Sequence, residues 1–547
     1  MGSVRSDAPG GRQPEDGIRF YVERSVLAAF LLLLGYLALF HQLGALAFLG
    51  ADEPRYARIG EEMAAGGDWV TPHLLGRPWL EKPPLLFWLE AAGIRLLGSS
   101  ETAARLPNAV LGWLCALALG WFLGRFAGRT AGVLAYCTLL SMPFFVAFAR
   151  SASTDLPLAV MLTLALLCIW AADESGRLRW AAAAGIFAGL ATLAKGPVTL
   201  VLLGGGYYLF SLWMGRWRWK WRMLGVSGVA FLATAAPWYV LVTLENGRHF
   251  WITFWLNHHL ARFVTDLHHH TQPFWYYLPL LLAGCFPWIL ALGPAVREWS
   301  LRRWRPGNER ERLEAYLLCF VFVTLAFFSA ARSKLPGYIL PVVPAVAALA
   351  ALQWRRFLGG EPGSYRVMKR TVAATAVLAV LLAGGLTGGF AVVYGAPLVG
   401  AAVGAPLLAL ALPAWNALGT RRPKFAFLTT VAALTCCLSL LYTLGAPIIS
   451  AHHSARNVCR VARAHVSPAE PLIFYRFYHH SARYYTDFAT TWDSIDSPQE
   501  LDSYLRRHPQ DEYFLLTHEA GWRELQECCG GQLVSKSGPF HLVKITP

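Results

Sequence analysis

The sequence predicts an α-helical polytopic membrane protein of about thirteen transmembrane helices, followed by a small C-terminal α/β domain. Three observations favour this fold class. Of the 547 residues, 55% are hydrophobic and only 15% are charged, whereas a soluble domain carries about 25% charged residues. The hydrophobic residues form blocks long enough to cross a bilayer, for example residues 27–48 and 372–393. Short basic clusters separate these blocks.

The basic clusters also predict the topology. The loops alternate between two sets, and one set, together with the N-terminal tail, holds more than twice as many Lys and Arg residues as the other. Because positive residues collect on the cytoplasmic side, the polar tail at residues 1–20 is predicted to be cytoplasmic and disordered. The first hydrophobic block is too long for a signal peptide and is expected to be retained. The expected spans begin near residues 25, 107, 130, 156, 180, 197, 222, 275, 312, 336, 371, 397 and 425.

Two polar regions lie outside the predicted spans. In the outer loop at residues 49–106, residues 83–99 are expected to form an amphipathic helix at the interface, because Glu90 and Arg95 interrupt the apolar run. An odd number of spans predicts that residues 450–547 lie on the outer, non-cytoplasmic side of the membrane. There, PLIFYRF, EYFLLT and FHLVKI predict strands, and SPQELDSYLRR and GWRELQE predict helices.

The net charge of +15 does not indicate a nucleic-acid partner. The basic residues come in short clusters between apolar blocks, which is typical of cytoplasmic loops rather than of a nucleic-acid-binding surface.

Polar motif residues gather on the predicted outer side of the membrane. Ionisable groups beside a membrane are costly unless they line a cavity or pair with one another, so the sequence predicts one polar cavity at this face. The candidate residues come from several loops: Asp52, Glu53, Arg55, Tyr56, Trp79, Glu81, Lys82, Asp155, Lys195, Arg262, Lys334 and Tyr338.

The side chains of this cavity combine three kinds of chemistry. The carboxylates of Asp52 and Asp155 can accept a proton or hold a cation. The Lys and Arg residues suit the oxygens of a phosphate or pyrophosphate, and aromatic residues such as Trp79 offer flat surfaces to a sugar or an isoprenoid chain. Together they predict transfer of a group from a lipid phosphate at the membrane surface.

Simpler interpretations exist for several of these residues. Asp52 can also serve as the N-cap of a helix that begins near Pro54. The histidines of the fourth outer loop could bind zinc with Glu81, but their spacing matches no zinc signature and favours a surface cluster without metal. In the C-terminal region, His479 to Tyr485 either form a binding surface or support the fold.

The order of the motifs resembles a known family. The first loop reads ADEPRYARIGEEMAAGGDWVTPHLLGRPWLEKPPLLFWL, and SASTDLPLAV, LAKGPV, HHLARF, PFWYYLP and ARSKLPGYILPVVPA follow in order. This series resembles the aminoarabinose (4-amino-4-deoxy-L-arabinose) lipid A transferases, which are GT-C glycosyltransferases related to protein mannosyltransferases. The motifs cover roughly residues 20–350.

This resemblance implies a GT-C catalytic domain at residues 21–449, with two juxtamembrane helices in its periplasmic loop, and a periplasmic domain at residues 450–547. It implies a multi-pass protein of the bacterial inner membrane that moves a sugar from a polyprenyl phosphate donor, usually undecaprenyl phosphate carrying aminoarabinose, to a phosphate of lipid A with inversion. No nucleotide cofactor is expected.

The resemblance also implies roles for individual residues. Asp52 matches the essential acidic residue of the family, and Asp155 belongs with it in the catalytic set. Glu81 and His259 match a metal position, so a divalent metal such as zinc is a candidate cofactor. Trp79 stands where a tyrosine is expected. Around the donor phosphate and sugar pocket, the residues that match the family are Arg55, Tyr56, Lys82, Asp155, Lys195 and Tyr338. Our expected substrate-binding set also includes Glu53, Trp79, Arg262 and Lys334.

Other functions share parts of this pattern. The same architecture serves protein O-mannosylation and the glycosylation of other envelope acceptors. A lipid-linked sugar transporter or flippase also has many spans, but transporters tend to show internal repeats and charges near the bilayer midplane, and this chain shows neither. A non-catalytic receptor would leave the first-loop motif without a purpose.

Overall fold

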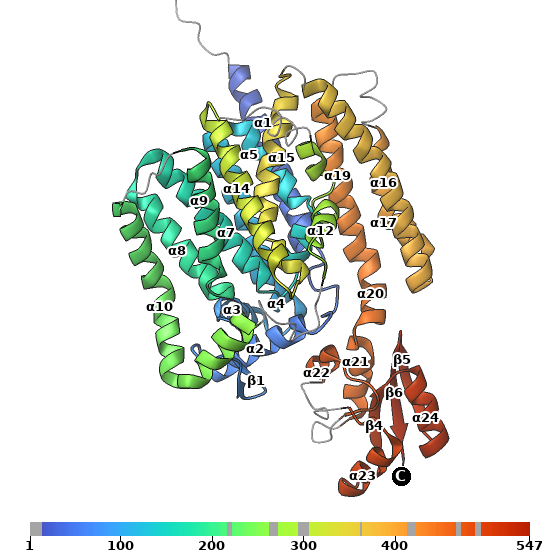
Figure 1. The fold of residues 1–547 in the computed structure, drawn as a ribbon. Coiled ribbons are helices and arrows are strands. Elements are labelled where there is room, and N and C mark those ends of the chain that lie inside the picture. The colour runs from blue at the N-terminus through green and yellow to red at the C-terminus, as the bar shows by residue number, and fades with distance from the viewer. Residues whose placement is uncertain are drawn as a thin grey trace, which may run out of the picture.

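The computed structural model describes residues 14–215, 221–261, 272–293, 306–361, 364–412, 422–466, 472–486 and 494–546, with the backbone alone described for 14–23 and 257–261. Long helices form one bundle, and a small α/β unit follows the last of them at the opposite end from the N-terminus (Figure 1). This arrangement confirms the predicted fold class, a polytopic helical protein with a small C-terminal domain.

Six of the described helices are long and apolar enough to cross a membrane, or seven if the bent pair α5 and α6 forms one span. The number of helices that cross the bilayer stays a prediction. The helices of the bundle are α1 (Pro14–Gly35), η1 (Tyr36–Phe40), α4 (Glu101–Phe126), α5 (Arg129–Leu140), α6 (Pro143–Ala149), α7 (Asp155–Ser175), α8 (Leu178–Lys195), α9 (Val198–Trp213), α10 (Trp221–Trp251), η2 (Ile252–Ala261), α12 (Tyr277–Gly284), η3 (Trp288–Ala291), α14 (Glu309–Ala330), η4 (Pro336–Ile339), α15 (Val342–Leu358), α16 (Ser364–Tyr394), α17 (Pro397–Leu408), α19 (Pro423–Leu440) and η5 (Leu441–Gly445).

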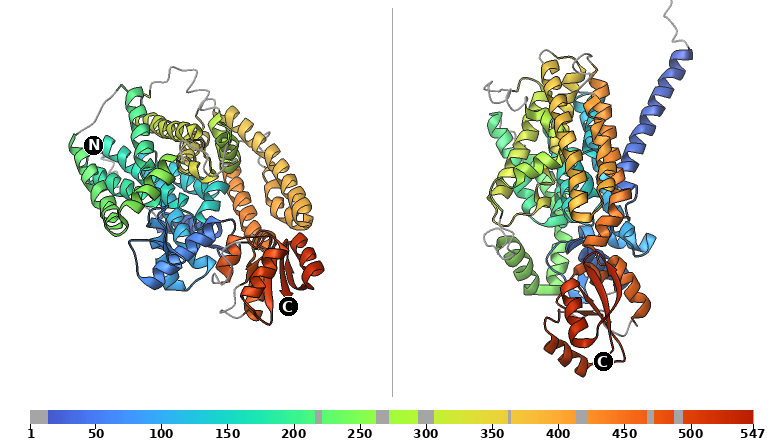
Figure 2. Two further views of the ribbon diagram at one scale, coloured as in Figure 1. Left: turned by 60° about the horizontal axis from the view of Figure 1, so that its bottom comes forward. Right: turned by 90° about the vertical axis from the view of Figure 1, so that its right-hand side faces the viewer.

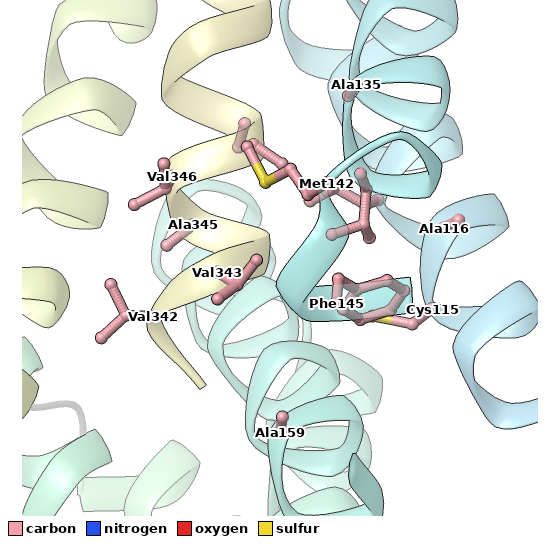
Figure 3. Close-up of a cluster of buried hydrophobic side chains, with 14 of the residues drawn as sticks. Cys115, Ala116, Ala135, Met142, Phe145, Ala159, Val342, Val343, Ala345 and Val346 are labelled. Carbon is pink, nitrogen blue, oxygen red and sulfur yellow. The ribbon is translucent and has the colours of Figure 1, made fainter. Parts of the chain in front are cut away.

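Small side chains let the helices of the bundle pack closely. A Cβ atom on Gly132 of α5 would overlap the backbone of Gly120 on α4, the kind of approach that small residues allow between membrane helices. Deeper in the bundle, Val343 of α15 lies in one buried cluster with Met142 and Phe145 from the bend between α5 and α6 (Figure 3).

The first loop folds into two short helices beside one end of the bundle. They are α2 (Asp52–Gly66) and α3 (Leu85–Leu97), and the two-residue strands β1 (His73–Leu74) and β2 (Arg77–Pro78) pair between them. Helix α3 lies within the predicted segment 83–99. Asp52 is not the N-cap of α2, because Ala51 holds that position and no side chain caps it.

The C-terminal unit is a mixed sheet with helices. Its strand order is β3-β4-β6-β5, with β3 parallel to β4 and the other pairs antiparallel. The three predicted strands and two predicted helices are all present, whereas β5, α21 and α22 were not predicted. The elements are α20 (Ala446–His453), α21 (Arg456–His465), β3 (Ile473–Phe474), α22 (His480–Tyr485), α23 (Pro498–Arg507), β4 (Tyr513–Thr517), α24 (Glu519–Cys529), β5 (Gln532–Ser537) and β6 (Phe540–Ile545).

Candidate functional site

The centre of the candidate site is an ion pair between Asp155 and Lys195. Asp155 is the first residue of α7, where the helix dipole favours an acidic side chain, and its backbone N–H donates to Ser153 Oγ at 3.1 Å. Lys195 is the last residue of α8, where the dipole favours a cation, and Gly196 (φ 90°) ends the helix. Two helix ends thus bring opposite charges together.

The segment around η4 forms one wall of this pair. Lys195 Nζ lies 4.6 Å from the centre of the Tyr338 ring, a cation–π contact. A Cβ atom on Gly337 would overlap the Asp155 carboxyl group, so only glycine fits there. The side chains of Lys195 and Asp155 are 15% and 18% exposed, so the pair is not completely closed to a ligand.

A second charged pair lies at the start of α2 in the first loop. Arg55 Nη2 donates to Asp52 Oδ1 at 2.5 Å, and its Nε donates to the carbonyl oxygen of Ala51 at 2.9 Å. The guanidinium of Arg55 also lies 5.4 Å from the ring centre of Trp79. The Asp52 side chain is 57% exposed, which makes it the more accessible of the two candidate carboxylates.

Tyr56 lies within electrostatic range of both charged pairs. Its side chain is buried, and burial raises the pKa of the Tyr56 hydroxyl well above its ordinary value. The negative charge of Asp52 raises this pKa further, the charge of Arg55 lowers it, and Asp155 raises it. Because the phenol of Tyr56 stays protonated between two carboxylates, it can donate a hydrogen bond to an oxygen of a ligand.

Glu53, which the sequence placed among the substrate-binding residues, is occupied by structural contacts. Its two carboxylate oxygens accept from Arg105 Nε and Nη2 at 2.9 and 2.8 Å, and Oε1 also accepts from the backbone N–H of Ala152 at 2.9 Å. Arg105 is buried and donates as well to three carbonyl oxygens between Leu43 and Ala47. Glu53 therefore fastens the first loop to α4 and to the segment before α7.

Lys334 was also expected to bind the donor phosphate, but its ammonium group makes a structural contact instead. Its side chain is buried, and its ammonium group donates to the carbonyl oxygen of Ala331 at 2.6 Å. This contact stabilises the turn that leads into η4. Lys334 therefore helps to position Tyr338, which belongs to η4.

The remaining predicted residues fall into two groups. Glu81 and Lys82 follow β2, are half-buried, and each has a partner. Arg262 lies outside the described residues, and His259 belongs to η2, where the backbone alone is described. In the part of the chain that the structure describes, no three His, Cys, Asp or Glu residues come together as a metal site, so the metal position stays a prediction.

The C-terminal unit docks on the first loop through two tyrosines of α22. Tyr484 donates to Glu61 on α2 at 2.7 Å, and Tyr485 donates to Glu101 at the start of α4 at 2.7 Å. The rings of Tyr484 and Tyr485 also contact Phe48. This run of residues therefore supports the fold at the edge of the candidate site.

His480 is a residue near the site whose position the sequence did not predict. Burial, and next the positive charge of Arg55, lower its pKa to about 4, while Asp52 acts in the opposite direction. His480 is therefore a neutral imidazole in the electric field of the Asp52–Arg55 pair. The tandem histidines were visible in the sequence, but only the docking of α22 connects them to the first loop.

Comparisons with known proteins agree with this fold and motif order. Residues 81–240 match the family model described as dolichyl-phosphate-mannose-protein mannosyltransferase. The chain is 33% identical over 322 residues to the undecaprenyl phosphate-alpha-4-amino-4-deoxy-L-arabinose arabinosyl transferase of Pseudomonas aeruginosa UCBPP-PA14, covering 57% of this chain and 56% of that protein. It is 31% identical over 349 residues to the Erwinia tasmaniensis protein of the same name, covering 61% and 62%.

The matched part thus spans little more than half the length of these relatives. Over nearly the whole chain, the fold is similar to the crystal structure of ArnT from Cupriavidus metallidurans bound to undecaprenyl phosphate. The TM-score is 0.75 at 24% identity, over 95% of this chain and 97% of that one. Its sequence is thus similar over part of its length to aminoarabinose transferases, and its fold is that of a GT-C membrane protein.

Proposed function

We propose that this protein transfers 4-amino-4-deoxy-L-arabinose from undecaprenyl phosphate to a phosphate of lipid A, with inversion at the anomeric carbon. The relatives from Pseudomonas aeruginosa and Erwinia tasmaniensis carry this donor in their names. The observation that carries the proposal is the Asp155–Lys195 pair, set against Tyr338 and beside the Asp52–Arg55 pair. Cations of this kind suit the phosphate of a lipid-linked sugar.

The cations hold the donor and stabilise the leaving group. As the bond between the anomeric carbon and the phosphate oxygen breaks, the electron pair stays on that oxygen, and the polyprenyl phosphate gains negative charge. Lys195 and Arg55 are already in place to stabilise that charge, which is how preorganised groups accelerate a reaction. Asp155 keeps Lys195 oriented, and Tyr56 donates to a phosphate or sugar oxygen.

The carboxylate of Asp52 acts on the acceptor side. An acceptor oxygen forms the new bond to the anomeric carbon from the face opposite the phosphate. A lipid A phosphate is already ionised, so Asp52 then orients groups and stabilises the positive charge that develops on the sugar. If the acceptor is instead a hydroxyl of a protein or another glycan, Asp52 takes its proton as general base.

The proposed location is the bacterial inner membrane, with the N-terminus in the cytoplasm and residues 450–547 in the periplasm. The distribution of basic residues supports this orientation. The donor sugar is already activated by its phosphate, so no nucleotide cofactor takes part. The proposal includes a zinc ion that Glu81 and His259 would hold, and no step above depends on it.

The test is transfer by the purified full-length protein in vesicles that contain the lipid-linked donor and lipid A. Mass spectrometry should detect lipid A heavier by one aminopentose. Asp52→Asn should abolish this product. Asp502→Asn is a matched control, because Asp502 is 58% exposed and also pairs with a nearby arginine, and this variant should retain full transfer.

Two outcomes would contradict parts of the proposal. Equal turnover by Asp52→Asn and Asp502→Asn would remove Asp52 from the mechanism. Unmodified lipid A in cells that express the protein, with a glycosylated protein or another envelope glycan in its place, would keep the reaction type and change the acceptor.

A further inference from the structure

A groove of about 870 Å³ lies at the end of the bundle opposite the candidate site. It runs between α1, α4, α5, α15 and α19 and includes Arg125 and Arg129, where α4 ends and α5 begins. The other end of α4 begins at Glu101, which bonds to the C-terminal unit. Figures 1 and 2 show these helix ends on the side of the bundle away from the C-terminal unit. The groove is therefore separate from the Asp155–Lys195 pair.

The walls of the groove are apolar and open to the lipid side of the bundle. Leu27 of α1 is 41% exposed, Trp121 of α4 is 59% exposed and Leu428 of α19 is 51% exposed. Three glycines from α4 and α5 also line it, among them Gly120 and Gly132. At these glycines the backbones of α4 and α5 approach each other closely, because a Cβ atom on Gly132 would overlap Gly120.

Three cations stand at one end of this apolar groove. Arg125 lies in the last turn of α4, Arg129 begins α5 and Lys424 lies in the first turn of α19. All three side chains are exposed. No acidic residue lines the groove among the described residues, and none of the three cations has an ion-pair partner there. Their charge is available to a ligand that arrives from the membrane.

We propose that this groove binds one anionic diacyl phospholipid of the surrounding membrane. The acyl chains lie along Leu27, Trp121 and Leu428, and the headgroup phosphate contacts Arg125, Arg129 and Lys424. Basic pockets at helix ends that continue into apolar grooves are suited to such headgroups. The lipid fills the space that α1 shares with α4, α5 and α19, and so holds the first helix in place.

The experiment measures the lipid that the full-length protein retains. The protein is purified in a neutral detergent from vesicles of equal parts phosphatidylglycerol and phosphatidylcholine, and its bound lipids are identified by native mass spectrometry. Wild-type protein should retain one phosphatidylglycerol. Each cation near an anionic headgroup contributes a factor of about five in affinity, so the triple variant Arg125→Ala, Arg129→Ala, Lys424→Ala should bind it roughly 100-fold more weakly.

A second triple variant supplies the matched control. Arg177, Arg222 and Arg366 are exposed cations near other helix ends and do not line the groove. Their replacement by alanine should leave the retained phosphatidylglycerol unchanged. Both triple variants should have the same melting temperature in detergent that carries no phospholipid, and added phosphatidylglycerol should raise that temperature only for the wild type and the control variant.

Three results would overturn the proposal. One is retention of phosphatidylcholine as strongly as phosphatidylglycerol. Another is equal loss of phosphatidylglycerol from both triple variants, which would indicate a diffuse charge effect. The third is displacement of the retained lipid by one equivalent of undecaprenyl phosphate, which would assign the groove to the polyprenyl lipid.

Discussion

The ammonium group of Lys195 pairs with the carboxylate of Asp155, although the two residues are 40 positions apart in the chain. Each residue stands at a helix end that suits its charge, and the Tyr338 ring covers the ammonium group at 4.6 Å. The pair therefore presents a fixed, partly exposed cation at the end of the bundle beside the first loop. This position makes Lys195 a residue on which transfer should depend directly.

Replacement of Lys195 by alanine should lower kcat/KM for the lipid-linked donor by a factor of about 10²–10³, the usual effect of removing one preorganised charge-stabilising group. Lys195→Arg should recover part of the activity because it keeps the charge. The measurement is sugar transfer in vesicles under single-turnover conditions. Lys536→Ala is the control, since Lys536 also pairs with a carboxylate but lies in the C-terminal unit. A donor turnover by Lys195→Ala equal to that of the control would exclude the assigned role.

A methyl group at position 337 should disturb the same pair without a change of charge. A Cβ atom on Gly337 would overlap the Asp155 carboxyl group, so Gly337→Ala should push that carboxylate away and reduce kcat by at least about tenfold. In Gly388→Ala the added methyl enters open space within α16, and transfer should stay normal. The melting temperatures of both variants show whether a loss of activity reflects unfolding. Wild-type kcat in Gly337→Ala would mean that η4 does not constrain the site.

Much of this fold could be predicted from the sequence, because long apolar blocks separated by basic clusters allow few other arrangements. In the C-terminal unit, β3, β4, β6, α23 and α24 were also predictable from their patterns of apolar and polar residues, whereas β5 and α21 were not predicted. The position of α22 was not predictable either, because its contacts with Glu61 and Glu101 join segments that are distant in the chain.

The site was predictable only in part. The sequence indicated which residues share the outer face, and the structure brings Asp155, Lys195 and Tyr338 together. The partner of each acidic residue could not be predicted: Glu53 and Asp52 are neighbours, yet Glu53 binds Arg105, which is 52 positions away. Such a pairing depends on how the first loop lies against α4, and no local pattern encodes that.

The contact between Glu53 and Arg105 should contribute to stability rather than to substrate binding. Arg105 is almost completely buried and Glu53 is 14% exposed. Breaking a buried pair leaves one charge without a partner, which destabilises a protein by about 3–5 kcal/mol. Glu53→Gln and Arg105→Met should therefore each clearly lower the melting temperature in detergent. The double variant should lower it by less than the sum of the two single decreases.

The exposed pair of Arg523 and Glu519 in α24 offers a control for this comparison. Exposed pairs contribute only about 0–1 kcal/mol, so Arg523→Met should melt close to the wild type. A Glu53→Gln variant with normal melting and a raised KM for the donor would restore Glu53 to the substrate-binding set.

Glu90 on α3 should make the stability of the protein depend on pH. Its side chain is completely buried, and neither carboxyl oxygen has a hydrogen-bond partner among the described residues. Burial raises the pKa of Glu90 well above its ordinary value, and the negative charges of Glu53 and Glu61 raise it further. The folded protein therefore favours the protonated form of Glu90. A raised pKa means that the full stability is present below the ordinary pKa of glutamate and is lost as the pH rises through the folded value.

The variant Glu90→Gln tests this dependence, because glutamine has the shape of the protonated acid and does not titrate. Its melting temperature should equal that of the wild type in acid and exceed it in alkali, so that the difference grows as the pH rises above the ordinary pKa of glutamate. Glu527→Gln, a change at an exposed position of α24, should shift neither curve. If the difference in melting temperature between Glu90→Gln and the wild type stayed constant from acid to alkali, Glu90 would be ionised in the folded protein. Glu90 would then need a cationic partner that the described contacts do not contain.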